Sequence, residues 1–183
     1  MAMRGVMRLS LGVAMSLCLG SAMLLAQSIG GRWFSSALSP DSEVPSVSSG
    51  ASGSIVVDVD EDGGEIRYTL SFTGLSSAVA QAHIHMAQES VNGGIMLWLC
   101  EGTSVSPLAS TPTCPQDGSV SGVLTPADVV AIGGANAGQQ IAAGEFVEAV
   151  AAIRKGLAYA NVHTANSPGG EIRGQLRQGG GHR

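Results

Sequence analysis

The chain has 183 residues and a formal net charge of −5. Its 14 acidic residues outnumber its 9 basic ones, so it lacks the basic surface that nucleic-acid-binding proteins use. It also lacks the polybasic segment that holds peripheral proteins on anionic membranes, so we expect neither a nucleic-acid partner nor that mode of membrane attachment.

Residues 1–26 have the pattern of a secretory signal peptide. Arg4 and Arg8 form a basic start, an apolar run covers residues 9–19, and small residues up to Ala26 offer cleavage sites. The alternative is an uncleaved anchor, because the apolar stretch is barely long enough to cross a bilayer. Cleavage would leave no stable membrane span and would place the mature protein in the periplasm or outside the cell.

The rest of the chain has the two-residue period of half-buried strands. A linker at residues 27–35 leads to an expected edge strand near Glu43 and Val44, and residues 179–183 form an expected disordered tail. Short helices are expected at residues 125–132 and 145–155, because a capping sequence precedes the first and a 3.6-residue period marks the second. The predicted fold is a mainly β, antiparallel sandwich with these helices in its second half. Its further strands are expected at residues 54–60, 65–73, 79–86, 95–100, 119–124, 159–164 and 171–178.

Two cysteines, Cys100 and Cys114, remain after the expected cleavage. An even pair outside the cytoplasm most simply forms a disulfide. The alternative is a pair that ligates a metal together with histidines, but its spacing matches no zinc knuckle. We therefore predict a Cys100–Cys114 disulfide.

Three of the four histidines lie in two short stretches with alternating polarity. His83 and His85 share the polar side of one predicted strand, and His163 takes the polar side of another. Imidazole is a common ligand of zinc and copper, so these strands could form a three-nitrogen site if they are neighbours. The alternative is three histidines on an outer sheet face that are hydrogen-bonded for structural reasons only. The nearest polar candidates to support such a site are Gln81, Tyr159, Asn161 and Glu171.

Three segments occur together in the CHRD (chordin) domain family: the His83–His85 strand that leads to the turn at 92–94, the strand at 159–164, and the hairpin at 167–175. The sequence resembles a CHRD domain over residues 36–178. The resemblance implies an extracellular, immunoglobulin-like β-sandwich. The growth-factor antagonism of chordin is not implied, because the cysteine-rich modules that accompany CHRD domains in chordin do not occur here.

The final hairpin motif suggests structural roles for four of its residues. Gly169 and Gly170 would supply the positive φ angles of a tight turn. Glu171 and Arg173 would share a strand face and help to set the strand register.

The residues support three hypotheses for function. The first is a binding module that holds copper or zinc through His83, His85 and His163 and works with a protein or glycan partner. The second is a mononuclear copper enzyme with dismutase-like or oxidase-like activity. The two-histidine strand is similar to one in copper-zinc superoxide dismutases, but no histidine is available to bridge two metals. The third is a metal-free structural or adhesion protein of the envelope.

Overall fold

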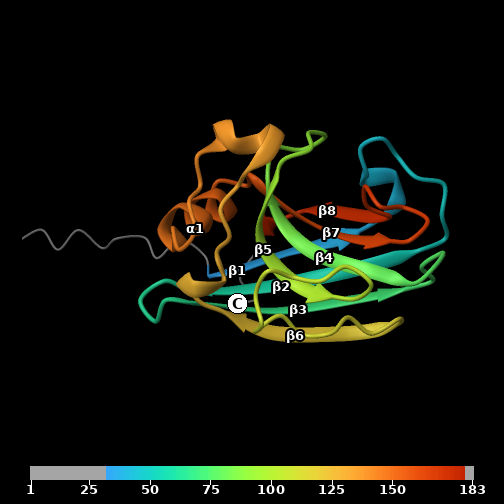
Figure 1. Cartoon of the computed structure of the whole chain (residues 1–183), viewed down its shortest axis with the longest axis horizontal. Helices are drawn as coiled ribbons and strands as arrows, with labels where there is room; N and C mark the ends of the chain where they lie inside the picture. Colours follow the sequence, from blue (N-terminus) through green and yellow to red (C-terminus); the bar gives the residue numbers. More distant parts are fainter. Residues whose placement is uncertain (1–31, 180–183) are drawn as a thin grey trace, which may run out of the picture.

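The computed structural model describes residues 32–179, which form two antiparallel sheets packed face to face (Figure 1). The strand order is β6-β3-β2-β1-β9 in one sheet and β5-β4-β7-β8 in the other. The predicted β-sandwich is therefore confirmed. The expected signal peptide lies outside the described residues, as do residues 180–183 of the expected tail. The strands are β1 Trp33–Leu38, β2 Ser52–Asp60, β3 Glu65–Thr73, β4 Val79–Met86, β5 Gly94–Glu101, β6 Gly118–Leu124, β7 Ala158–Thr164, β8 Ile172–Gln175 and β9 Arg177–Gln178.

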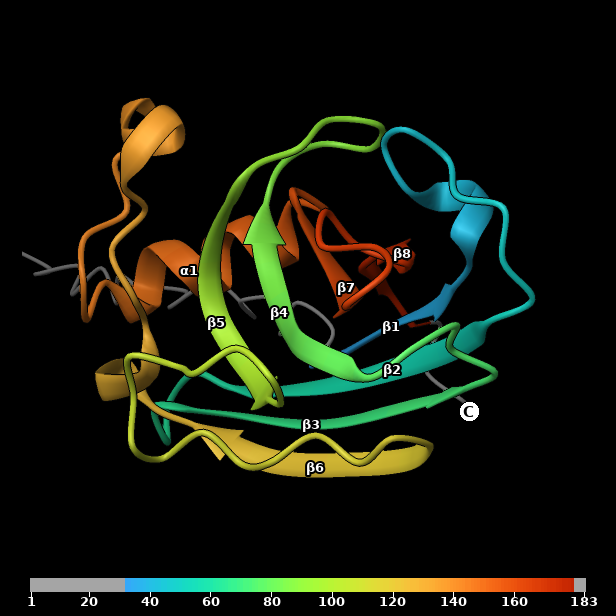
Figure 2. The ribbon, with the colours of Figure 1, turned by 45° about the vertical axis from the view of Figure 1, so that its right-hand side comes forward.

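The core lies between the two sheets and follows the alternation of the sequence. On β3, the inward side chains are Ile66, Tyr68, Leu70 and Phe72, and each of them is buried. The hairpin predicted from this alternation is present, because β2 pairs with β3 along its whole length. In the second sheet, β4 and β5 curve strongly away from the flatter β2, β3 and β6 (Figure 2). The curved sheet carries all three histidines of the candidate site.

The first strand differs from the prediction. The chain enters the sheet at β1, whose alternating Phe34 and Leu38 face the core, so the strand begins within the expected linker. The prediction of an edge strand near Glu43 and Val44 is wrong, since these residues lie in a loop after the 3-10 turn η1 Pro40–Ser42. Prolines on both sides lack the N–H group that a strand ladder needs, which explains why this segment does not pair.

The prediction of a helix at residues 125–132 is also wrong for most of that range. Its capping box forms as predicted, but the helix stops after one turn, η2 Pro126–Asp128. Val129 and Val130 then extend along β5, where the Val130 amide donates to the carbonyl of Met96. Valine is β-branched and favours extended backbone, so pairing with the edge of β5 prevails over the helix. A further 3-10 segment, η3, covers Gly134–Gln139.

The second helix is confirmed as α1 Phe146–Arg154. Phe146, Val150 and Ile153 bury its apolar face against one end of the sandwich. Gly156 follows the helix with a φ of 68°, a conformation that glycine adopts without strain. The last strand, expected to be continuous from 171 to 178, is instead divided between β8 in one sheet and β9 in the other, with buried Leu176 at the crossing.

The disulfide predicted between Cys100 and Cys114 is present and joins the end of β5 to the loop that follows it. Both cysteines are buried, in contact with the hydrophobic core. In the chain-entropy account, closing a loop of this length stabilises the folded state by about 3 kcal/mol. We therefore expect the Cys100→Ser/Cys114→Ser variant to unfold at lower urea concentration, with a free energy of unfolding about 3 kcal/mol smaller. Wild-type protein unfolded with a thiol reductant should match the variant, and an unchanged midpoint in both experiments would show that the bridge adds no stability.

Candidate metal centre

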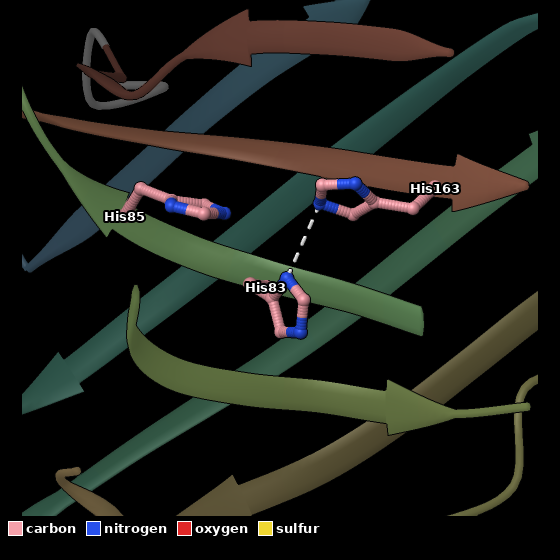
Figure 3. A group of neighbouring side chains, drawn as sticks. All are labelled: His83, His85 and His163. Carbon is pink, nitrogen blue, oxygen red and sulfur yellow. Dashed lines mark hydrogen bonds between the residues drawn. The ribbon is translucent and has the colours of Figure 1, made fainter. Parts of the chain in front are cut away.

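The three histidines come from two neighbouring strands of the curved sheet. His83 and His85 lie on β4 and alternate with Ala82 and Ile84, which enter the hydrophobic core. β7 pairs with β4 in antiparallel register, which places His163 opposite Gln81. The three imidazoles therefore gather on the sheet face that points away from the core (Figure 3).

This face was expected to lie on the outside of the sheet, but the structure buries it. His83, His85 and His163 are only 0, 7 and 6% exposed. A register shift between β4 and β5 pairs Trp98 with His83, and the two rings meet nearly at right angles with centroids 4.3 Å apart. No local pattern indicates that the indole of Trp98 would cover a polar face. The histidines therefore lie in a desolvated environment and not on an open surface.

Backbone carbonyls fix the orientation of two of the rings. His85 Nδ1 lies 2.9 Å from the carbonyl oxygen of Gly93, and His163 Nδ1 lies 2.9 Å from that of Pro168. A carbonyl oxygen only accepts hydrogen bonds, so in both rings Nδ1 carries the proton and donates. In the neutral rings, each Nε2 then presents a lone pair, which is the form that binds metal ions. At His163 this lone pair faces Asn161 Oδ1 at 2.9 Å, so a metal on Nε2 requires the Asn161 amide to turn away from it.

The remaining nitrogens face one another. His83 Nδ1 lies 3.3 Å from His163 Nε2, and one nitrogen from each ring can be chosen so that all three lie within 4.8 Å of one another. In Figure 3 the His85 ring extends toward His163, with His83 to one side of the space between them. Nε2 of His83 and Nε2 of His85 are buried without a hydrogen-bond partner among the described residues. A buried polar atom without a partner is unfavourable. In Figure 3 the second nitrogen of His83 is turned away from the other two rings, so the unused bonding capacity inside the cluster belongs to His85 Nε2.

All three histidines have a lowered pKa. Burial is the main cause in each case, because it disfavours the charged imidazolium. For His83, the neighbouring His163 and His85 lower the pKa further. The pKa of His85 falls to about 4, although its hydrogen bond to Gly93 opposes the change. At neutral pH the three rings are therefore uncharged and ready to act as ligands.

These shifts predict that metal-free protein loses stability in mild acid. The folded pKa values lie below the unfolded value near 6.5, so the unfolded chain binds more protons as the pH falls through that value. The free energy of unfolding should therefore decrease by up to about 1.4 kcal/mol per pH unit for each histidine. Urea titrations of chelator-treated protein at pH 7.5 and 5.5 would measure this loss before most carboxylates titrate. His85→Gln should show a smaller loss, and equal stability of the wild type at both pH values would contradict the prediction.

Two of the four residues proposed from the sequence to support the site contact the histidines. The Tyr159 ring is stacked on His85 at a centroid distance of 4.8 Å, with 4° between the planes. Asn161 Oδ1 lies 2.9 Å from His163 Nε2. Gln81 is the cross-strand neighbour of His163, but no hydrogen bond joins its side chain to the cluster within residues 32–179. Glu171 is directed elsewhere and accepts hydrogen bonds from Ser49, Ser76 and Thr164.

Glu171 and Arg173 each contact the neighbouring strand β7, through Thr164 and Tyr159 respectively, but no ion pair joins the two within residues 32–179. Glu171 precedes β8, and the Arg173 guanidinium lies over the Tyr159 ring. Gly170 has a φ of 124° as expected for the turn, whereas Gly169 is not among the residues with positive φ. A Cβ atom on Gly170 would lie 2.2 Å from Glu43 Oε1, so the turn needs glycine also for this close approach.

Glu43 is a site neighbour that the sequence did not indicate. It is 4% exposed, and Asn161 Nδ2 lies 3.5 Å from its Oε1 atom. Burial raises the pKa of Glu43, although the Val44 amide, Arg173 and Asn161 oppose the shift. Its place depends on contact between a loop and strand β7, 118 residues apart along the chain, which no local pattern reveals.

One edge of the cluster adjoins the protein surface. His85 and Trp98 line a cavity of about 450 Å³, together with Ile95, Pro107 and the 130–133 segment. His85 is the member of the cluster that lines this cavity. Within residues 32–179, no helix has the length and apolar character needed to cross a membrane.

Comparison with known proteins gives one result for this chain. The model of the CHRD domain family matches residues 34–176, which is most of the chain. No match was found among curated proteins or among solved structures.

Proposed function

The chain belongs to the CHRD domain family, and we propose that it is an extracytoplasmic binding module that holds one copper or zinc ion through His83, His85 and His163. The observation that carries the proposal is the convergence of three buried imidazoles whose pKa values are lowered, with Nε2 of His85 lacking a hydrogen-bond partner among the described residues. A structural set of histidines would be expected to satisfy its own hydrogen bonds.

The geometry supports a transition metal. Zinc–nitrogen bonds of about 2.0–2.1 Å in a tetrahedral site place neighbouring nitrogens about 3.3 Å apart. His83 Nδ1 and His163 Nε2 are at 3.3 Å in a hydrogen bond, so a metal ion would take the place of the proton that His83 Nδ1 donates. His85 would complete the set by a modest approach, since the chosen atoms lie within 4.8 Å of one another. The hydrogen bonds of His85 and His163 to backbone carbonyls are the kind that orient metal-binding histidines.

The donor set favours copper or zinc over calcium or magnesium. Imidazole suits copper and zinc, whereas calcium and magnesium prefer oxygen ligands. Thiolate ligation is not part of the proposal, because Cys100 and Cys114 form a disulfide.

We further propose that the protein works outside the cytoplasm after removal of residues 1–26, as a domain at about residues 36–178. The disulfide supports this location, since such bonds persist in oxidising compartments. A protein or glycan that binds the sandwich surface would be its partner.

Metal titration of the mature protein tests the proposal. Protein purified from a secreting host and treated with a chelator should bind one equivalent of Cu²⁺ or Zn²⁺ and become more resistant to thermal unfolding. Ca²⁺ and Mg²⁺ serve as controls and should have no effect at the same concentration. Binding below 0.3 equivalents for both Cu²⁺ and Zn²⁺, on the order of adventitious occupancy, would overturn the proposal.

A copper redox enzyme is the second candidate. Three imidazoles would leave coordination positions free on copper, and a cavity adjoins the cluster at His85. Copper-loaded protein should then catalyse superoxide dismutation faster than metal-free protein. Equal rates for the two samples would exclude this activity.

A further inference from the structure

Arg173 is a buried cation close to the histidine cluster. It is 2% exposed, and no ion pair within residues 32–179 includes it. Its guanidinium instead donates from Nη1 to Asn92 Oδ1 at 3.0 Å and from Nη2 to the carbonyl of Val91 at 2.8 Å. The buried Glu43 is near enough for Arg173 to lower its pKa, but the two form no ion pair among the described residues. Burying a charge without direct ion-pair contact is costly, so the position of Arg173 calls for an explanation beyond strand pairing.

The guanidinium of Arg173 is connected to His85 in two ways, and the first is through the aromatic ring of Tyr159. Arg173 Cζ lies 3.4 Å from the centroid of the Tyr159 ring, a cation–π contact. The same ring is parallel to His85, with 4° between the planes. β7 lies between β4 and β8, so Tyr159 is flanked by His85 on one neighbouring strand and Arg173 on the other. The Tyr159 ring thus contacts both the Arg173 guanidinium and the His85 ring, and it restrains the His85 ring.

The second route runs through the turn at residues 91–93. Arg173 holds Val91 and Asn92, while the next residue, Gly93, accepts the hydrogen bond from His85 Nδ1. The Gly93 amide also donates to the hydroxyl oxygen of Tyr159 at 3.3 Å. Both routes therefore end at the same imidazole, one at its face and one at its Nδ1 atom.

We propose that Arg173 is a positioning residue for His85, which orients its Nε2 toward the other two imidazoles and places a fixed positive charge near the metal. This proposal rests on the proposed function. The charge disfavours further positive charge at the site, so it favours Cu⁺ over Cu²⁺ and raises the reduction potential of a bound copper ion.

Two substitutions separate geometry from charge. Arg173→Met removes both, whereas Arg173→Lys keeps the charge and loses the guanidinium contact with Tyr159 and the forked hydrogen bonds. Arg177→Met is the matched control, because Arg177 lies on β9 in an exposed ion pair with Glu89. Asn92→Ala removes one acceptor of Arg173 from an exposed position and serves if the Arg173 variants fail to fold.

The first readout needs no metal. In the wild type, NMR should detect a slowly exchanging Nδ1 proton on His85. This signal should broaden or disappear in Arg173→Met, Arg173→Lys and Asn92→Ala, but not in Arg177→Met. If the Arg173 variants fold and keep this signal, the positioning role is overturned. If the Arg173 variants do not fold, a retained signal in Asn92→Ala overturns it. Neither outcome depends on whether the protein binds metal.

The second readout uses Cu²⁺. Arg173→Met should weaken Cu²⁺ binding by about 10–100-fold, the usual effect of losing a residue that orients a ligand. It should also lower the copper reduction potential, while Arg173→Lys should keep a potential close to that of the wild type. Equal potentials in the wild type and Arg173→Met would overturn the electrostatic part. If the wild type does not bind Cu²⁺, both the electrostatic part and the proposed function are overturned. The NMR readout without metal would still decide the positioning role.

Discussion

Replacing His83 and His85 together by alanine is expected to abolish stoichiometric binding of copper or zinc. The variant removes two of the three converging imidazoles and leaves His163 alone, with its Nδ1 atom still bonded to Pro168. A single imidazole cannot supply the three or four protein ligands that zinc and copper sites use. We expect affinity for Cu²⁺ or Zn²⁺ to fall by at least about 100-fold, measured by competition with a chromophoric chelator.

Two controls accompany this experiment. His182→Ala removes a histidine outside the described residues and should keep the wild-type stoichiometry. Circular dichroism should show that the double variant keeps its β-sheet signal, so that loss of metal is not loss of fold. Full metal content in a folded double variant would show that the ion binds elsewhere in the chain.

Replacing Glu171 by alanine is expected to cause a large loss of stability. Its buried carboxylate accepts hydrogen bonds from the Ser49 hydroxyl, from the amide and hydroxyl of Ser76, and from the Thr164 hydroxyl. These residues belong to three separate segments, so the carboxylate joins the turns at one end of the sandwich. Removing it leaves several donors without an acceptor, which should lower the free energy of unfolding by about 3–5 kcal/mol.

Urea denaturation would measure this loss, with Glu148→Ala as the control. Glu148 lies on the exposed side of α1, so its replacement should change stability by no more than about 0.5 kcal/mol. A loss below about 1 kcal/mol for Glu171→Ala would contradict the assigned role of the carboxylate.

The same carboxylate predicts a dependence on pH. Burial would raise the pKa of Glu171, but the hydrogen bonds from Thr164, Ser49 and Ser76 outweigh burial and lower the pKa. A folded pKa below the unfolded value stabilises the protein above the unfolded pKa, and this contribution is lost as the pH falls through the folded pKa. The stability difference between wild type and Glu171→Ala should therefore be constant near neutral pH and shrink in acid.

The sheets could be predicted from the sequence because each strand carries its own pattern. The alternation of Ile66, Tyr68, Leu70 and Phe72 identifies β3 and its buried face without further information. Where the prediction was wrong, contacts between distant segments decide the structure. Val129 and Val130 leave a correctly capped turn to pair with β5, and nothing near them in the sequence indicates that the edge of β5 is free.

The candidate site shows the same division. The ligand types and their strand positions were evident for His83, His85 and His163, since alternation places each on the polar face. Their burial was not evident, because Trp98 reaches His83 only through an irregular register between β4 and β5. Arg173 was expected to reach the neighbouring strand, but its partner there, Tyr159, depends on the order of β4, β7 and β8 in the sheet.

X-ray absorption spectroscopy of protein loaded with one equivalent of Cu²⁺ or Zn²⁺ tests the central claim most directly, because it reports the ligands of the metal itself. The account predicts three imidazole nitrogens at about 2.0 Å, with one or two further light atoms from solvent or an exogenous ligand. A first shell dominated by oxygen with at most one imidazole would contradict it, because the metal would then be bound outside the histidine cluster.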